Sequence, residues 1–275
     1  MRGREMAELD GKVAIVTGAG RLRGMGRAAA VHLAHLGADL VVTGTGRDPS
    51  TFPPDEKAAD WKDAESTAEQ VRAQGRRALS LIVDVTNREH VQTMVDRTVQ
   101  ELGRVDILIN NAAYPRGADR VPILELDPDV FQRVVDIKVT GAYLCSRAAV
   151  RQMVRQGDGG KIVNIASTEG KRPMPNTLAY NAANFAMVGM TGSMAKELGA
   201  HRININCVCP GIVDTHRADG IGRGERWRQM AAAVPLGRNG TDEEVGGFIA
   251  FLCTKAASWI HGQSINIDGG AIMEH

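Results

Sequence analysis

The chain has 275 residues, of which 43% are hydrophobic and 4% aromatic. This length and apolar content are enough for one domain with a sizeable core, so we expect a single domain over residues 1–275. The formal net charge is +1, from 33 basic and 32 acidic residues. A near-neutral chain with few aromatic side chains argues against nucleic acid or an anionic membrane as partner, and favours a small molecule.

The cysteines and histidines argue against a disulfide framework and against a metal site. Four cysteines show no paired CxxC spacing, and the seven histidines show no metal-ligand spacing. We expect reduced, buried thiols at Cys145, Cys207, Cys209 and Cys253, and no metal. Residues 1–10 are charged and lack the apolar core of a signal peptide, and no apolar run is long enough to span a membrane. The sequence therefore predicts a cytoplasmic protein.

Short β-rich runs alternate with longer helical stretches along the chain. Strands are expected at 13–17, 40–43, 79–83, 107–109, 162–165, 203–208 and 264–267, and helices at 26–36, 63–74, 88–102, 128–156, 179–198 and 242–253. The strands are almost continuously apolar, as burial on both faces of a parallel sheet requires. Such alternation, with right-handed crossovers, predicts an α/β fold: a doubly wound, seven-stranded parallel sheet flanked by helices.

A glycine-rich turn, TGAGRLRGMG at residues 17–26, lies between the first strand and the first helix. Glycines at Gly18, Gly24 and Gly26, the last two flanking Met25, let the chain turn tightly and let backbone N–H groups approach a pyrophosphate. The anion would then rest at the positive end of the helix. Many strand-to-helix turns need glycine for steric reasons alone, but the position after the first strand favours dinucleotide binding.

A serine and a tyrosine thirteen residues apart form the second candidate site. Ser167 follows the strand at 162–165, and Tyr180 opens the helix at 179–198. Both can meet over the carboxyl edge of the sheet, where open α/β folds bind ligands. The serine can orient a carbonyl, and the tyrosine hydroxyl can pass a proton to or from its oxygen. The alternative is a capping serine and a buried tyrosine.

Seven motifs stand in the order of the short-chain dehydrogenase/reductase family, which the chain resembles from residue 11 to residue 270, in its 3-oxoacyl-carrier-protein-reductase-like branch. The motifs are the glycine turn, Asp84-Val85, Asn110-Asn111-Ala112-Ala113, Ser167, Tyr180, residues 210–215 (PGIVDT) and residues 267–270 (IDGG). The resemblance implies a Rossmann fold, a nicotinamide cofactor, and hydride exchange between an alcohol and a carbonyl.

The resemblance also implies roles for individual residues. Ser167 would bind the substrate oxygen and Tyr180 would be the acid/base. Residues 211–240 would form the substrate-binding segment, and the helices at 128–156 and 179–198 would build the interfaces of a homotetramer, with a dimer as the alternative. The cofactor-binding positions, from adenine and adenosine ribose to nicotinamide, would be Asp84, Val85, Asn111, Ala112, Pro210, Gly211, Val213 and Thr215.

Three departures from the family pattern concern the site itself. The glycine turn has two extra residues between Gly18 and Gly24, Lys138 stands where an asparagine is usual, and Asn184 stands where a lysine is usual. In the family that lysine lowers the pKa of the tyrosine, whose reference value is about 10. An ammonium at Lys138 could restore the field, and Asn184 could still bind a ribose hydroxyl. An active enzyme with a rearranged site, a weak or altered enzyme, and a nucleotide-binding protein without catalysis all remain open.

The end of the second strand bears on the choice of cofactor. NAD-preferring relatives usually have an aspartate there, which holds the ribose hydroxyls and repels a 2′-phosphate. Here the residue is Gly44, followed by Thr45 and Arg47, and Arg23 lies in the glycine turn. These cations favour NADP(H), with NAD(H) possible, unless both arginines are solvated surface charges. Residues 44–62 are expected to be a long loop, either a solvated insertion or a flap beside the adenosine end.

The motifs do not identify the substrate. The residues that could line its binding site follow strands four, five and six. Each could equally be an ordinary surface residue or a packing residue of the core: Tyr114, Arg116, Glu169, Met174, His216 and Trp227. If Arg116 and His216 point inward, an anionic or hydroxylated substrate would suit them.

Overall fold

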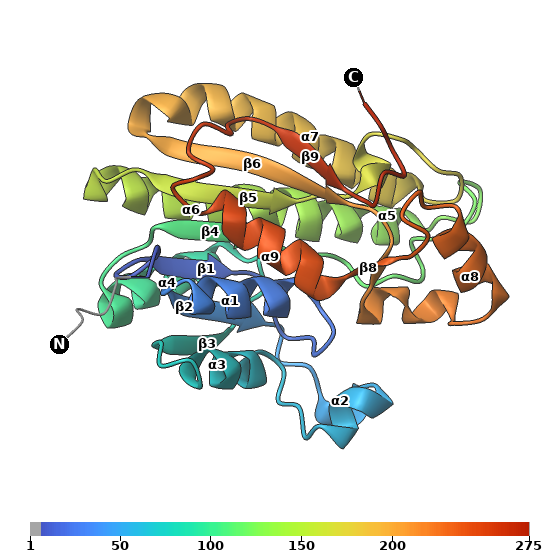
Figure 1. Ribbon diagram of the computed structural model, residues 1–275, viewed down its shortest axis with the longest axis horizontal. Coiled ribbons are helices and arrows are strands. Elements are labelled where there is room, and N and C mark those ends of the chain that lie inside the picture. Colours follow the sequence, from blue (N-terminus) through green and yellow to red (C-terminus); the bar gives the residue numbers. More distant parts are fainter. Residues whose placement is uncertain (1–6, 275) are drawn as a thin grey trace.

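The computed structural model describes residues 7–274 and contains the expected seven-stranded parallel sheet (Figure 1). Its strand order is β3-β2-β1-β4-β5-β6-β9, so the chain winds outward in both directions from β1 and β4. The strands are β1 (Val13–Val16), β2 (Asp39–Gly44), β3 (Ala78–Ile82), β4 (Ile107–Asn110), β5 (Gly160–Ile165), β6 (Ile203–Pro210) and β9 (Ser264–Ile267). The expectation that residues 1–10 are not a signal peptide concerns a segment of which residues 1–6 lie outside the described residues.

Helices cover both faces of the sheet, as a doubly wound fold requires. One core cluster joins the sheet to α1 (Met25–His35), α3 (Ala64–Arg72) and α9 (Asp242–Leu252), and contains Leu33 and Ile249. The other joins it to α4 (Arg88–Leu102), α6 (Gly141–Gln156) and α7 (Leu178–Leu198), and contains Met94 and Met153. Figure 1 shows α1 and α9 in front of the strands, with α7 along the upper side beside β6.

The segment expected to be a loop, 44–62, is partly helical, so that expectation is wrong in its middle. It contains a 3₁₀ turn, η1 (Pro49–Thr51), and a short helix, α2 (Pro54–Ala58). The reason is local: proline occupies the first helical position, where its missing N–H costs nothing, and two acids follow in the first turn. The side chain of Glu56 in this helix is 1% exposed, so the segment packs on the fold.

The long helix expected at 128–156 is interrupted. It consists of α5 (Pro128–Val135), a π-helical turn η2 (Asp136–Thr140) and α6. Lys138 lies in the middle of this π turn. At Gly141, which follows it, a Cβ would lie 2.6 Å from Cγ2 of Val85, so the helix passes close to the end of β3. Such π turns inside helices are frequent at functional sites.

Residues 211–240 form a small substructure after β6. It comprises β7 (Val213–Asp214), a 3₁₀ turn η5 (His216–Ile221), α8 (Glu225–Ala232) and β8 (Gly240–Thr241), with β7 and β8 paired in parallel. Because β7 follows β6 directly, the substructure stands at the carboxyl end of the sheet (Figure 1).

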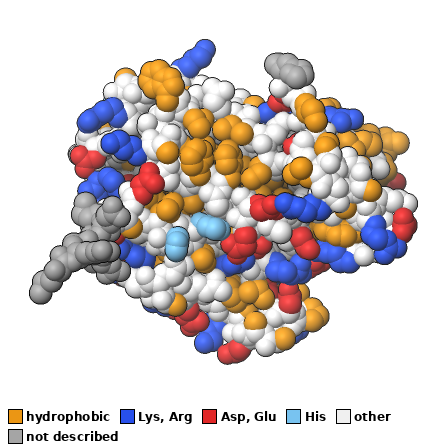
Figure 2. All heavy atoms as spheres, viewed as in Figure 1, with side chains coloured by type: hydrophobic (Ala, Val, Ile, Leu, Met, Phe, Trp, Pro, Cys, Tyr) orange, Lys and Arg blue, Asp and Glu red, His pale blue; other side chains and the backbone are white. Residues whose placement is uncertain are grey.

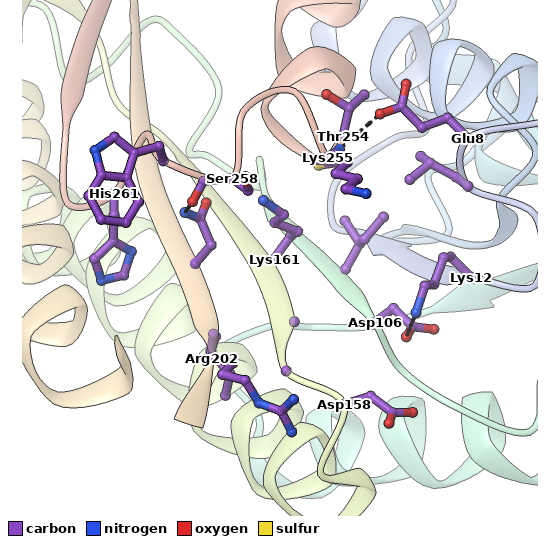
Figure 3. Close-up of a pocket in the computed structure, with 18 of the residues that line it drawn as sticks. Glu8, Lys12, Asp106, Asp158, Lys161, Arg202, Thr254, Lys255, Ser258 and His261 are labelled. Carbon is purple, nitrogen blue, oxygen red and sulfur yellow. Dashed lines mark hydrogen bonds and ion pairs between the residues drawn. The ribbon is translucent and has the colours of Figure 1, made fainter. Parts of the chain in front are cut away.

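A large cavity of about 730 Å³ lies at the opposite, amino end of the strands. Asp106, Lys161 and Ile203 line it, near the starts of β4, β5 and β6, and Figure 3 shows Lys12 pointing toward Asp106 at its edge. It is therefore separate from the carboxyl edge, where the glycine turn, Ser167 and Tyr180 gather.

All four cysteines are buried free thiols. Among residues 7–274, no helix has both the length and the apolar character needed to cross a membrane.

Candidate active site

The glycine turn leaves the amino end of α1 open to a ligand. Gly24 precedes the helix without a side-chain cap, and the first turn contains no acidic residue. The first N–H groups of the helix therefore keep their capacity for an anion. Gly18 has a φ of +66°, and a Cβ there would lie 2.9 Å from Cα of Ala112. These features fit a bound pyrophosphate.

Asn111 and Ala112 connect this turn to the end of β4. The backbone N–H of Asn111 donates to Oγ1 of Thr17 at 3.0 Å, and that of Ala112 at 3.1 Å. The side-chain amide of Asn111 donates to the carbonyls of Thr17 (2.9 Å) and Gly18 (2.8 Å). Both residues thus position the glycine turn through hydrogen bonds, while their own chains remain partly exposed.

The remaining predicted cofactor positions surround the same edge. Asp84 holds its own turn, accepting from the N–H of Thr86 at 2.9 Å. Val85 is buried against Gly141. At Gly211 a Cβ would lie 2.7 Å from Cβ of Asp268, so this turn packs on the IDGG segment. Pro210 ends β6, and Val213 and Thr215 are buried just beyond it.

Ser167 and Tyr180 come from neighbouring elements that pack closely. Ser167 precedes the 3₁₀ turn η3 (Thr168–Gly170), and its Oγ accepts from the N–H of Glu169 at 3.2 Å. Tyr180 lies in the first turn of α7. At Gly170 a Cβ would lie 2.8 Å from the carbonyl oxygen of Asn184, so η3 rests against α7 one turn beyond Tyr180.

Two arginines that the motifs do not mark lie against the Tyr180 ring. The guanidinium carbon of Arg120 is 4.0 Å from the ring centre, and that of Arg217 is 4.8 Å from it. Arg120 belongs to the segment between β4 and α5, and Arg217 to η5. Both distances are within the range of cation–π attraction. No local pattern relates these residues to Tyr180, so the sequence held no signal for them.

A buried acid fixes the two arginines. Asp119 has a fully buried side chain, 3.3 Å from Nε of Arg120 and 3.8 Å from Nη2 of Arg217. Arg120 also pairs with Glu169 at 3.3 Å, and Arg217 donates to the carbonyl of Tyr114. Asp119 therefore holds both guanidinium groups in place beside the tyrosine ring.

Arg116 adds a further positive charge to this region. Burial lowers the pKa of its guanidinium, and the neighbouring Arg120 and Arg217 lower it further. Within residues 7–274 it forms no ion pair. Of the predicted lining residues, Tyr114, Arg116 and Glu169 therefore lie in the Tyr180 region.

The other predicted lining residues are not brought into this group. His216 lies by the glycine turn: its N–H donates to the carbonyl of Arg23, and its ring is 3.1 Å from Asp219. Burial lowers the pKa of this histidine. Trp227 packs under Arg223, at 4.2 Å, and Met174 is half-exposed before α7.

Lys138 and Asn184 are both buried. The Lys138 side chain is 6% exposed, and burial lowers its pKa to about 8; Arg217 lowers it too, while the thiols of Cys207 and Cys209 act in the opposite sense. The amide of Asn184 donates to the carbonyl of Tyr180 at 2.8 Å, and its Oδ1 has no hydrogen-bond partner among the described residues. Lys138 is therefore a buried amine near Arg217 and the thiols of β6, and Asn184 is engaged with the backbone of its own helix.

The region expected to hold the adenosine end of the cofactor, around the end of β2, contains acidic as well as basic side chains. Arg47 pairs with Glu56 at 2.9 Å and with Asp63 at 3.0 Å. Arg23 pairs with Asp55 at 2.7 Å and with Asp219 at 2.6 Å. Neither arginine is thus a solvated surface charge, and neither is free of a carboxylate. Thr45 is exposed beside them.

Comparison with known proteins agrees with this geometry. The family model described as enoyl-(acyl carrier protein) reductase matches residues 18–271. The chain belongs to the short-chain dehydrogenase/reductase family. A 3-oxoacyl-[acyl-carrier-protein] reductase from Synechocystis is 34% identical over 98% of this chain and 100% of that protein. A sorbitol dehydrogenase from Cereibacter sphaeroides is 34% identical over 96% of this chain and 99% of that protein.

Solved structures lead to the same family. A short-chain type dehydrogenase/reductase from Mycobacterium marinum superimposes with a TM-score of 0.85 at 32% identity, covering 98% of this chain and 99% of that one. These comparisons confirm the Rossmann fold and the family, and they make the chain an oxidoreductase of the short-chain dehydrogenase/reductase type.

Proposed function

We propose that the chain is an active NAD(P)(H)-dependent alcohol dehydrogenase or carbonyl reductase, with Tyr180 as acid/base and Ser167 orienting the substrate oxygen. The observation that carries the proposal is the pair of guanidinium groups against the Tyr180 ring, at 4.0 and 4.8 Å. Loss of the family's lysine at Asn184 removes one cation from the tyrosine, whereas these two arginines, which also pair with Asp119, bring guanidinium groups to its ring.

The guanidinium groups of Arg120 and Arg217 lie against the face of the tyrosine ring. In the proposed reaction Tyr180 gives its proton to a carbonyl oxygen or takes it from an alcohol, while the hydroxyl of Ser167 donates to the same oxygen. The nicotinamide, when bound, supplies or accepts the hydride at the adjoining carbon.

The residues around the tyrosine favour an anionic substrate. Arg116, Arg120 and Arg217 stand against two acids, Asp119 and Glu169, and Arg116 has no ion pair within the described part of the chain. A half-buried, unpaired guanidinium near Arg120 and Arg217 is suited to a carboxylate or a phosphate. We therefore assign the substrate to carbonyl or hydroxy compounds that carry such a group.

Assembly as a homotetramer, with a dimer as the alternative, is part of the same proposal. A tetramer with two-fold symmetry needs two distinct interfaces. Helix α7 offers one, because residues 178–195 carry no charged side chain and Phe185 is 44% exposed. The face of α9 and β9 offers another: Phe251 and Trp259 are exposed, and Figure 2 shows hydrophobic side chains gathered over this side. The four free thiols suit a reducing compartment such as the cytoplasm.

The experiment that tests the activity is turnover of paired compounds, each a keto acid and its methyl ester, with either nicotinamide. We expect turnover of the acids, a higher kcat/KM for each acid than for its ester, and none in Tyr180→Phe, which keeps the ring and its packing. Cofactor binding by the wild type without turnover of any compound would favour the alternative, a nucleotide-binding protein without catalysis.

A further inference from the structure

The carboxylate of Asp63 occupies the space that a side chain at the end of β2 would fill. A Cβ added to Gly44, the last residue of that strand, would lie 2.5 Å from Oδ2 of Asp63 and 3.0 Å from its Cγ. A separation of 2.5 Å is shorter than a Cβ makes with any non-bonded atom, so this carboxylate excludes a side chain at residue 44. A Cβ added to Gly20 in the glycine turn would overlap Oδ1. The carboxylate thus lies between the end of β2 and the glycine turn.

Asp63 is held there at a cost in backbone energy. Its φ is +54°, a region that residues with a side chain rarely adopt, and it precedes α3 without capping it. The residue is 9% exposed. Oδ1 accepts from Arg47, whereas Oδ2 has no hydrogen-bond partner among residues 7–274. A buried carboxylate oxygen without a donor is unfavourable unless a ligand completes it.

The inserted segment, residues 45–63 between β2 and α3, ends in Asp63 and is bound to the glycine turn itself. Nε1 of Trp61 donates to the carbonyl of Gly20 at 2.7 Å. The buried carboxylate of Glu56 accepts from the N–H of Leu22 at 3.1 Å and lies 3.4 Å from Arg21. Arg21 and Leu22 are the two residues by which this turn exceeds the usual length. The longer turn and the inserted segment therefore match one another, and together they position the carboxylate.

From this geometry we propose that Asp63 selects NAD(H) over NADP(H), by supplying from the inserted segment the carboxylate that Gly44 lacks. The proposal rests on the proposed function, since it presupposes a nicotinamide dinucleotide on the glycine turn. A carboxylate at the end of β2 accepts hydrogen bonds from ribose hydroxyls and repels a 2′-phosphate. The expectation of NADP(H) relied on Arg23 and Arg47 as cations for that phosphate, and both are already paired with acids.

The test is titration of NADH and of NADPH into the purified protein, with fluorescence as the readout, so that binding is measured without turnover. We expect the wild type to bind NADH at least about tenfold more tightly, as one charge-assisted contact and one repulsion imply. Asp63→Asn keeps the shape and accepts the positive φ, and should lose most of this preference. Glu65→Gln, two residues further along in α3, is the matched control: its surface pair with Arg72 is worth little, so the preference should not change.

A second test moves the carboxylate from residue 63 to residue 44, so that the result does not depend on whether the Asp63→Asn variant folds. Gly44→Asp alone should weaken NADH binding, because its Cβ meets Oδ2 of Asp63. Combined with Asp63→Gly, which suits the positive φ, it should restore the preference for NADH. The idea is overturned if the wild type binds NADPH as tightly as NADH, or if a folded Asp63→Asn keeps the wild-type preference. If neither nucleotide binds the wild type, the proposed function itself fails and this inference fails with it.

Discussion

The guanidinium carbon of Arg120 lies 4.0 Å from the centre of the Tyr180 ring. In the short-chain dehydrogenase/reductase pattern a lysine one turn along the helix supplies the cation for this tyrosine, and here that position is a buried asparagine. The cation reaches the ring from a different part of the chain, the segment between β4 and α5. A guanidinium thus lies against this tyrosine where the family pattern has a lysine on the next turn of the helix.

The first prediction concerns this arginine. Arg120→Met should lower kcat by about 30-fold, since a desolvated cation–π contact is worth about 2 kcal/mol. Arg120→Lys should recover part of the loss, because the charge returns without the planar group. Steady-state kinetics across pH, with cofactor binding measured in parallel, provide the readout. Arg228→Met is the control, an exposed arginine paired only with Glu225 on α8. An Arg120→Met enzyme with wild-type kcat would remove this arginine from the mechanism.

The second prediction is that Lys138→Met raises the free energy of unfolding at pH 7. Burial lowers the Lys138 pKa from 10.5 to about 8, so holding the charged form below that pH costs about 3 kcal/mol. Between pH 8 and 10.5 the unfolded chain binds more protons than the folded one, so the stability of the wild type rises with pH. The advantage of the variant should shrink across that window. Denaturant unfolding at pH 7 and pH 10 measures both values.

The third prediction concerns the activity of the same residue. A buried charge that costs stability at neutral pH and lies in a π turn is expected to have a catalytic use. Lys138→Ala and Lys138→Met should lower turnover sharply and move the basic limb of the pH–rate profile upward, because a cation leaves the site. If turnover and pH profile both match those of the wild type, Lys138 is a bystander in catalysis.

The fourth prediction addresses the attachment of the inserted segment. Glu56 is 1% exposed and lies within ion-pair distance of Arg21 and Arg47. Glu56→Gln should destabilise the protein by about 3–5 kcal/mol, the cost of leaving buried partners uncompensated. Limited proteolysis should then cut residues 45–62 faster than in the wild type. Glu69→Gln, which removes only an exposed pair with Lys62, should behave as the wild type in both measurements.

The fifth prediction tests assembly. Phe185→Glu introduces a charge on the uncharged surface of α7 and should dissociate the oligomer along that interface without unfolding the subunit. Light scattering over a wide concentration range gives the mass of each form. Lys196→Glu, nearer the end of the same helix and already charged, is the control. A wild type that has the mass of one subunit at every concentration contradicts the tetramer and the dimer.

The sequence alone predicted the architecture and the order of the motifs. Buried parallel strands need continuous apolar runs, and the turn at 17–26 needs glycines, so both leave local patterns that can be read without a structure. It also marked Ser167 and Tyr180. Ser167 follows a strand that ends at the carboxyl edge of the sheet, and Tyr180 opens a helix that begins at the same edge. The sequence did not predict the π turn at Lys138 or the helix at Pro54–Ala58, because each is a short irregularity inside a longer segment.

Only the tertiary structure decided which charges meet. Arg120 lies in the segment between β4 and α5 and Arg217 in η5, and no spacing in the chain connects either of them to Tyr180. The cations Arg23 and Arg47 were visible in the sequence, whereas their partners Asp55, Asp219, Glu56 and Asp63 were not. Ion pairs form across whatever surfaces the fold brings together, and a side chain's partner is therefore a property of the folded chain. For the same reason Gly44 signalled a missing carboxylate, and only the folded chain showed Asp63 in its space.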